Sequence, residues 1–220
     1  QRSAKGSMLI VPPTGGSNFL DRQYASALCD QGFRAVILES WQGQGEKSLN
    51  LQVHDRLLTR AQQAIEKVLD AQETSFKGIL GTSVGALHAA AALGRQKKLS
   101  AGFLIARSDQ KALKNYRSKR KAKFGYATET EYAEALNQVI SPQLDPLNYK
   151  SQLKNKALFL VVAEADQTVP SETQNHWVES FEPEQVRRFD SGHFWSIFKT
   201  WWFYEDEMVH FFNHHWEKNH

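Results

Sequence analysis

This sequence has little cysteine, no long apolar run and only a small excess of positive charge. Its 220 residues hold a single cysteine, Cys29, which excludes an internal disulfide and any metal site built from several cysteines. Cys29 stands among Tyr24, Ala25, Ala27 and Leu28, and this setting predicts the buried face of a helix.

Membrane and nucleic-acid partners find little support in the composition. No apolar run approaches the roughly 18 residues of a membrane span, and no charged segment precedes an apolar one in the manner of a signal peptide. The first residue is not methionine, so the compartment stays open; the default expectation is a soluble, cytoplasmic protein unless a removed N-terminal signal directed export. The net charge of +3, from 27 basic and 24 acidic residues, predicts no nucleic-acid partner.

The sequence does contain a repeated alternation of short apolar runs and amphipathic segments. At 41% hydrophobic, the chain is long enough for one α/β domain, which we place at residues 1–220. The alternation predicts a mostly parallel, twisted sheet with helices on both faces, and the last, partly charged strand should lie near a sheet edge. The expected strands are residues 8–11, 35–38, the run that ends at Gly81, 102–106, 157–162 and 186–189.

The first helix has clear boundary signals. Asn18 is predicted to cap it, because an Asn side chain accepts a hydrogen bond from a backbone N–H of the first turn. Asp21, three residues on, favours the positive end of the helix, and Gly32 is placed to end it.

The third apolar run leads into Gly81-Thr82-Ser83-Val84-Gly85, and an alanine-rich helical segment follows at once. Strand, sharp turn and helix are the context of a nucleophile elbow, in which the turn lifts a serine hydroxyl above the sheet edge. The two glycines remove side chains that would collide in such a turn. The alternative is a glycine-rich turn with an incidental serine. The context favours Ser83 as a nucleophile.

Two later loops supply the groups that a serine nucleophile needs. A serine hydroxyl requires an adjacent base near neutral pH, and a carboxylate on the far nitrogen of that base fixes its tautomer. His193 follows the sixth run and is the best-placed base, with His54 as second choice. Asp166 follows the fifth run and is the favoured acid, with Glu164 as its rival.

Other roles stay open for some of these residues. Asp166 is alternatively a turn residue that prepares the next helix, although Ser171 and Gln174 already form a predicted capping box there. His210 and His214 lie four residues apart but lack a third ligand at a diagnostic spacing, so we predict a solvated helix face and no metal.

An acyl-transfer site also needs hydrogen-bond donors for the oxyanion. One is the N–H of Val84, directly after the nucleophile. The other is expected in the loop 12–18, where Thr14 is the first residue after Pro12 and Pro13 that is able to donate. The alternative for this loop is a plain proline-glycine turn.

With these loops placed, the sequence resembles the α/β-hydrolase family, and most of all its small esterase and dienelactone-hydrolase-like branches. The order Ser83, Asp166, His193 is that family's nucleophile, acid and histidine order. The Asp-x-x-Val-Pro after the acid, the Ser-Gly-His-Phe around the histidine and the Gly-Gln-Gly-x-x-Ser at 43–48 also match. The resemblance covers residues 8–215 and implies an α/β-hydrolase fold and a serine hydrolase that uses no cofactor.

Three departures from the family pattern stand out. Pro12-Pro13 replaces the His-Gly that often opens the oxyanion loop. A serine stands at 83 where true dienelactone hydrolases carry a cysteine. The chain also starts at what would be the family's third strand, so the first two are expected to be missing or removed.

The segment 107–156 stands where this fold commonly carries a cap over the site. Its stretch 111–123 is strongly basic, which indicates either a solvated helix face or a collar that attracts an anionic substrate or surface. The helix expected at 129–139 is the part that should pack. Candidates for the substrate pocket are Trp41, His54, Phe194 and Trp195.

The expected activity is hydrolysis of a small-molecule carboxylic ester, or with less support a thioester or amide, through an acyl-enzyme. Acyl transfer and perhydrolysis on the same residues are alternatives, and so is a binding protein that keeps the fold without turnover. The sequence names neither the acyl nor the leaving group, because specificity depends on pocket shape.

Overall fold

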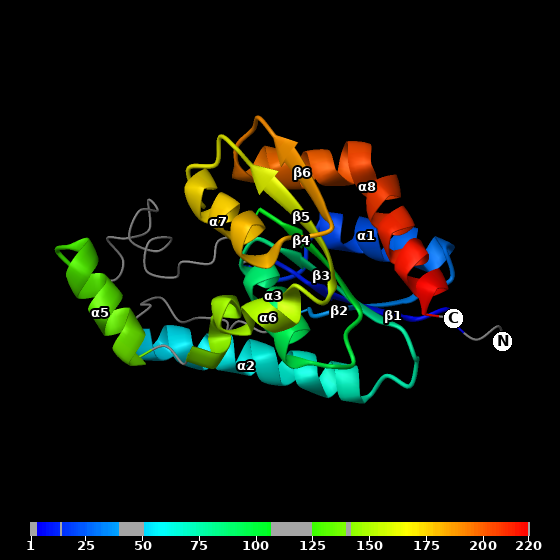
Figure 1. The fold of residues 1–220 in the computed structure, drawn as a ribbon, viewed down its shortest axis with the longest axis horizontal. Coiled ribbons are helices and arrows are strands. Elements are labelled where there is room, and N and C mark those ends of the chain that lie inside the picture. Colours follow the sequence, from blue (N-terminus) through cyan, green and yellow to red (C-terminus); the bar gives the residue numbers. More distant parts are fainter. Residues whose placement is uncertain (1–3, 14, 40–50, 107–124, 140–141, 220) are drawn as a thin grey trace.

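A computed structural model of the protein describes residues 4–13, 15–39, 51–106, 125–139 and 142–219. Six strands form one sheet in the order β2-β1-β3-β4-β5-β6, and every neighbouring pair is parallel (Figure 1). The predicted parallel sheet is therefore confirmed, with the charged sixth strand at an edge. The strands are β1 (Ser7–Val11), β2 (Arg34–Ile37), β3 (Lys77–Thr82), β4 (Ala101–Ile105), β5 (Ala157–Ala163) and β6 (Gln185–Phe189).

Helices cover both faces of this sheet (Figure 1). Helices α1 and α8 bury one face, where Met8 and Ile10 of β1 point, while Leu9 and Val11 point to the face covered by α2, α3 and α7. Because alternate strand residues face opposite sides, a strand buried on both sides is apolar throughout. The helices are α1 (Phe19–Asp30), α2 (Leu51–Asp70), α3 (Val84–Arg95), α7 (Ser171–Phe181) and α8 (His193–Lys218).

Between β4 and β5 the described residues form a small helical group. Helix α5 covers the predicted residues, and its Tyr132 and Leu136 are buried against Leu51 and Leu58 of α2. The basic stretch 111–123 lies outside the described residues. The group comprises α5 (Glu129–Val139), η2 (Pro142–Leu144), η3 (Pro146–Tyr149) and α6 (Lys150–Leu153).

Helix α1 begins and ends where the sequence predicts. The Asn18 side chain accepts a hydrogen bond from the N–H of Leu20 at 2.8 Å, and Asp21 accepts one from the N–H of Asn18 at 2.9 Å. After the helix, Gly32 adopts a φ of +86°, a conformation that suits glycine.

Two predictions about helices are wrong. Cys29 is exposed, because α1 buries a face defined by Leu20, Tyr24 and Leu28, and the next residue points about 100° away from it. The predicted capping box at Ser171 also fails: α7 is capped by Pro170, with no side-chain hydrogen bond to the cap.

Helix α8 is 26 residues long but is kinked at Tyr204, whose φ of −134° and ψ of 18° are not helical. The Tyr204 ring packs on Phe189 at 5.2 Å between ring centroids and lies 4.6 Å from the guanidinium carbon of Arg187. In the described part of the chain, no helix combines the length and the apolar character that crossing a membrane would require.

Candidate active site

Ser83 occupies the turn between β3 and α3. Its φ of 54° and ψ of −120° are a backbone conformation that a residue with a side chain rarely adopts. The surrounding hydrogen bonds hold it there, since the N–H of Ser83 donates to the carbonyl of Ile105 on β4 at 3.0 Å. Such strain is typical of functional sites and places this hydroxyl at the carboxyl edge of the sheet.

Gly81 and Gly85 allow α3 to approach the sheet at this turn. A Cβ on Gly81 would lie 2.6 Å from the Cα of Ala86. A Cβ on Gly85 would lie 2.0 Å from the carbonyl oxygen of Val11 and 2.4 Å from that of Pro12. Both positions therefore require glycine for a close approach of backbone to backbone.

His193, the first residue of α8, joins Ser83 to Asp166. Its Nε2 lies 2.9 Å from the Oγ of Ser83, and its Nδ1 lies 2.6 Å from the Oδ2 of Asp166. An ionised carboxylate only accepts hydrogen bonds, so Nδ1 carries the proton. In the neutral ring, Nε2 is then the acceptor for the serine hydroxyl. The structure brings together the three residues that the sequence analysis singled out.

The Asp166 carboxylate is fully buried, and hydrogen bonds reach both of its oxygens. Oδ1 accepts from the N–H groups of Thr168 at 2.7 Å and Val169 at 2.9 Å. Oδ2 accepts from His193 and also from the side-chain amide of Gln174 at 3.3 Å. These donors hold the carboxylate in one orientation toward the imidazole.

Residues 35–201 match the family model described as Serine hydrolase (FSH1), a span of more than half of the 220 residues that contains Ser83, Asp166 and His193. This chain belongs to the FSH1 serine hydrolase family. A comparison of its sequence with curated proteins found no match.

Three of the solved structures that are similar to this FSH1-family hydrolase come from different organisms. An esterase of Pyrococcus furiosus has a TM-score of 0.67 at 18% identity, over 96% of this chain and 83% of that one. A protein of Thermus thermophilus has a TM-score of 0.70 at 15% identity, over 98% and 91%. A carboxylesterase structure from Nitrososphaera gargenis has a TM-score of 0.62 at 15% identity, over 99% and 92%. The expected α/β-hydrolase fold is confirmed.

Glu164, the rival acid of this FSH1-family hydrolase, pairs with another residue in the described structure. Glu164 forms an exposed ion pair with Arg188 at 2.6 Å. The side chain of His54 lies outside what the structure describes, although its backbone is part of α2.

Gln174 is the residue that sequence reasoning assigned wrongly. It belongs to α7, is 2% exposed, and contacts Asp166 instead of capping its own helix. One signal in the sequence could have identified it. Gln174 is three residues before Trp177 and four before Val178, so it lies on the face of α7 that packs on the sheet. An uncharged buried polar side chain requires partners, and here those partners belong to the acid loop.

The predicted oxyanion donors are only partly described. Val84 is the first residue of α3, so its N–H has no acceptor within the helix. Thr14 lies outside the described residues. The start of its loop, at Val11 and Pro12, lies against Gly85 in the first turn of α3, so this loop is next to the elbow.

The predicted pocket residues are largely at the surface or not described. Trp41 lies outside the described residues, and Phe194 and Trp195 are 65% and 59% exposed. Their rings begin a series of contacts along α8: Trp195 lies 5.6 Å from Phe198, which lies 5.8 Å from Trp202. A row of aromatic rings, exposed at Trp195 and Trp202 and partly buried at Phe198, therefore starts close to His193.

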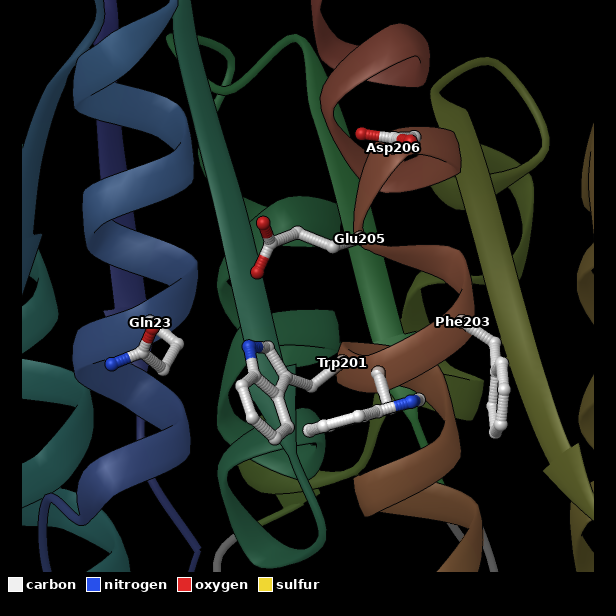
Figure 2. A pocket seen from close by; sticks show the side chains of 6 residues that line it. Gln23, Trp201, Phe203, Glu205 and Asp206 are labelled. Carbon is white, nitrogen blue, oxygen red and sulfur yellow. The ribbon is translucent and has the colours of Figure 1, made fainter.

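A cavity of about 380 Å³ lies farther along α8, where this helix faces α1. Figure 2 shows Trp201 and Glu205 extending from α8 toward Gln23 of α1. Burial, and to a smaller degree the nearby Asp206, raise the pKa of Glu205. The lining contains none of the three residues around Ser83, and consists of Gln23, Trp201, Trp202, Phe203, Glu205 and Asp206.

Proposed function

We propose that this hydrolase cleaves carboxylic esters through a covalent acyl-enzyme on Ser83, with His193 as the base and Asp166 as the group that orients it. The observation that carries the proposal is the position of His193, within hydrogen-bond distance of both other side chains at once. That arrangement meets the geometric requirement for an activated serine nucleophile.

In the first half of the reaction, the Ser83 Oγ attacks the ester carbonyl carbon while its proton passes to His193 Nε2. The Asp166 carboxylate stabilises the imidazolium that forms. The N–H of Val84 donates to the developing oxyanion, and Thr14 is the proposed second donor. The imidazolium then returns the proton to the alkoxide oxygen as the C–O bond breaks, which releases the alcohol and leaves the acyl-enzyme.

In the second half, His193 removes a proton from water, and the resulting hydroxide attacks the acyl carbon. The imidazolium gives that proton to Ser83 Oγ as the acyl–serine bond breaks, which releases the carboxylic acid. No proton is lost or gained overall, so the three side chains return to their starting state. This cycle uses only groups of the protein and water.

An ester is the favoured substrate for two reasons. An alcohol is a better leaving group than an amine, so ester cleavage makes a smaller demand on the same three side chains than amide cleavage does. Esterases of Pyrococcus furiosus and carboxylesterases of Nitrososphaera gargenis share the fold, which supports the same substrate class here. Thioesters and amides are less favoured substrates of the same machinery.

A fluorophosphonate probe and a series of p-nitrophenyl esters test the proposal. The wild-type protein should become labelled on Ser83 and hydrolyse the esters, while Ser83→Ala should abolish labelling. Ser191→Ala is the matched control, because Ser191 lies two residues before His193 but its hydroxyl hydrogen-bonds to Ser196. A folded wild-type protein that never labels would overturn the proposal and favour the non-catalytic binding protein.

Acyl transfer and perhydrolysis would use the same acyl-enzyme with a different second nucleophile. Competition with methanol or hydrogen peroxide during ester turnover separates the three reactions by their products. A carboxylic acid as the dominant product at low concentrations of either competitor supports hydrolysis.

We also propose that residues 107–156 form a cap over the site and that the stretch 111–123 attracts anionic substrates. The packing of α5 on α2 supports an attached helical group after β4. Measuring kcat/KM for anionic and neutral esters across ionic strength tests the basic collar, because only the anionic ester should slow as salt screens the attraction. Equal salt responses would overturn it.

A further inference from the structure

Gln174 contacts the loop that carries Asp166 at three separate points. Its side chain is 2% exposed and hydrogen-bonds to Ala163 at the end of β5, to Asp166 and to Val169. A buried side chain with partners at both ends of a seven-residue loop connects α7 to the whole loop. Gln174 is thus positioned to decide where the Asp166 carboxylate lies.

The amide of Gln174 has only one orientation that satisfies these partners. The N–H of Ala163 donates to Oε1 at 2.9 Å, which identifies that atom as the carbonyl oxygen. The NH₂ group then faces acceptors only: the Val169 carbonyl at 2.8 Å, the Asp166 Oδ2 at 3.3 Å and the Ala163 carbonyl at 3.4 Å. One amide proton serves Val169, and the other lies between the remaining two oxygens.

The oxygen that Gln174 reaches is the one that faces His193. Oδ2 of Asp166 accepts from both side chains, whereas Oδ1 is held by the N–H groups of Thr168 and Val169. The carboxylate has no exposed surface, so water cannot replace a missing donor without the loop opening. Without the Gln174 amide, Oδ2 would accept a hydrogen bond from His193 alone and would attract the imidazole proton more strongly. The Asp166 loop would also lose the hydrogen bonds that connect it to α7.

We propose that Gln174 is a positioning residue for the reaction proposed above: it holds the Asp166 loop and shares Oδ2 with His193, and so sets the orientation and basicity of the imidazole. This inference rests on the proposed function of Ser83, His193 and Asp166. Gln174 does not touch the substrate, and its effect reaches the reacting atoms through Asp166.

Gln174→Met tests the proposal, because methionine has a similar length and volume but neither donor nor acceptor of comparable strength. We expect kcat for p-nitrophenyl acetate to fall by about 10-fold or more, with little change in KM, because a shifted base misaligns the attacking oxygen. We also expect the acid limb of the pH–rate profile, where His193 takes up a proton, to move up by about 0.5 pH unit.

Thr173→Val is the matched control. Thr173 is adjacent on α7, is equally buried at 2% exposure, and donates from Oγ1 to the Pro170 carbonyl at 2.7 Å without touching Asp166. Thr173→Val should lower the unfolding temperature, because it removes one buried hydrogen bond. It should leave the acid limb of the pH–rate profile unchanged. Rates are compared at a temperature where all variants are folded, and the rate of fluorophosphonate labelling against pH is a second readout.

The outcomes separate this inference from the proposed function. If the wild-type protein neither labels nor hydrolyses esters, the proposed function fails first. If the wild type is active and Gln174→Met keeps its kcat, or lowers kcat without moving the acid limb, the positioning role is wrong. If Thr173→Val shifts the acid limb of the pH–rate profile by the same amount, the effect of Gln174→Met comes from altered packing, and the positioning role is also wrong.

Discussion

The Nε2 atom of His193 lies 2.9 Å from the Oγ of Ser83, although 110 residues separate them in the chain. The contact exists because β3 and β6 both end at the carboxyl edge of one parallel sheet, and each is followed by a turn into a helix. In open α/β sheets, ligands bind at this edge. The order of the strands in the sheet thus brings Ser83 and His193 into contact, although neither residue's local sequence indicates the other as its partner.

Replacing Asp166 by Asn should lower kcat/KM for a p-nitrophenyl ester by about 10⁴-fold, because an amide neither fixes the tautomer of His193 nor stabilises the imidazolium. Glu164→Gln is the control, since Glu164 pairs with Arg188 at the surface, and it should stay within about 2-fold of wild type. Comparable losses in the two variants would contradict the assignment of Asp166.

Ser83→Gly should be more stable than Ser83→Ala by about 1 kcal/mol, although both variants are inactive. The φ of 54° and ψ of −120° at Ser83 strain any residue with a Cβ by about 1–3 kcal/mol, and glycine removes that strain. The greater freedom of glycine in the unfolded chain offsets about 0.5–1 kcal/mol of the gain. Urea unfolding of both variants measures the difference, and equal or reversed stabilities would show that the turn is unstrained.

Gly85→Ala should destabilise the protein by about 3 kcal/mol or displace α3 and abolish activity, because the new methyl group would lie 2.0 Å from the Val11 carbonyl oxygen. Gly192→Ala is the control for added volume near the site. A Cβ there would meet the Ala165 carbonyl oxygen at an ordinary 3.7 Å, so we expect a loss of less than about 1 kcal/mol. Thermal and urea unfolding rank the two, and a tolerated Gly85→Ala would contradict the close approach.

Asp21→Asn should stabilise the protein at pH 7 but not at pH 4. Burial, and to a lesser degree the Glu39 carboxylate, raise the pKa of Asp21 from 3.8 to about 6, while the Asn18 N–H opposes the shift. The folded state therefore holds this proton after the unfolded chain has released it. The stability from the neutral form is complete below pH 4 and is lost as pH rises to 6, by about 2–3 kcal/mol.

Asparagine keeps the acceptor for the Asn18 N–H and has no proton to lose, so it removes this dependence. The free energy of unfolding of both proteins is measured in urea at pH 4, 5, 6 and 7, and the difference between them isolates Asp21 from other titrating groups. A difference that stays constant across this range would show that Asp21 is not titrating with a raised pKa.

Trp195→Ala should raise KM for p-nitrophenyl octanoate by about 5-fold and leave p-nitrophenyl acetate nearly unchanged, if the ring beside His193 contacts the acyl chain. Trp202→Ala is the control, because Trp202 is exposed to a similar extent, 61% against 59%, but lies two helical turns farther along α8. Equal effects on both esters, or an equal effect of the control, would remove Trp195 from the pocket.

Much of the fold follows from local patterns in the sequence. Continuous apolar runs such as Ala157–Ala163 predict strands buried on both faces, and Asn18 and Gly32 mark the ends of α1 because their preferred conformations are local properties of the backbone. The Gly-x-Ser-x-Gly sequence predicts its turn for the same reason. Two predictions are wrong: Cys29 lies one residue beyond the buried face of α1, and the partners of Gln174 lie on the loop before α7 instead of at its own helix cap.

The amino-acid sequence by itself determined the strands, the sharp turn at Ser83 and a short set of candidates for the three residues that a serine hydrolase would use, since each depends on side chains within one short segment. Only the tertiary structure decided that His193 contacts Asp166 and not Glu164, that Gln174 holds the acid loop, and that Phe194 and Trp195 lie open at the surface. These outcomes depend on which way a side chain points from its backbone and on what a remote helix places beside it. Both are set by packing across the sheet, which acts between residues far apart in the chain.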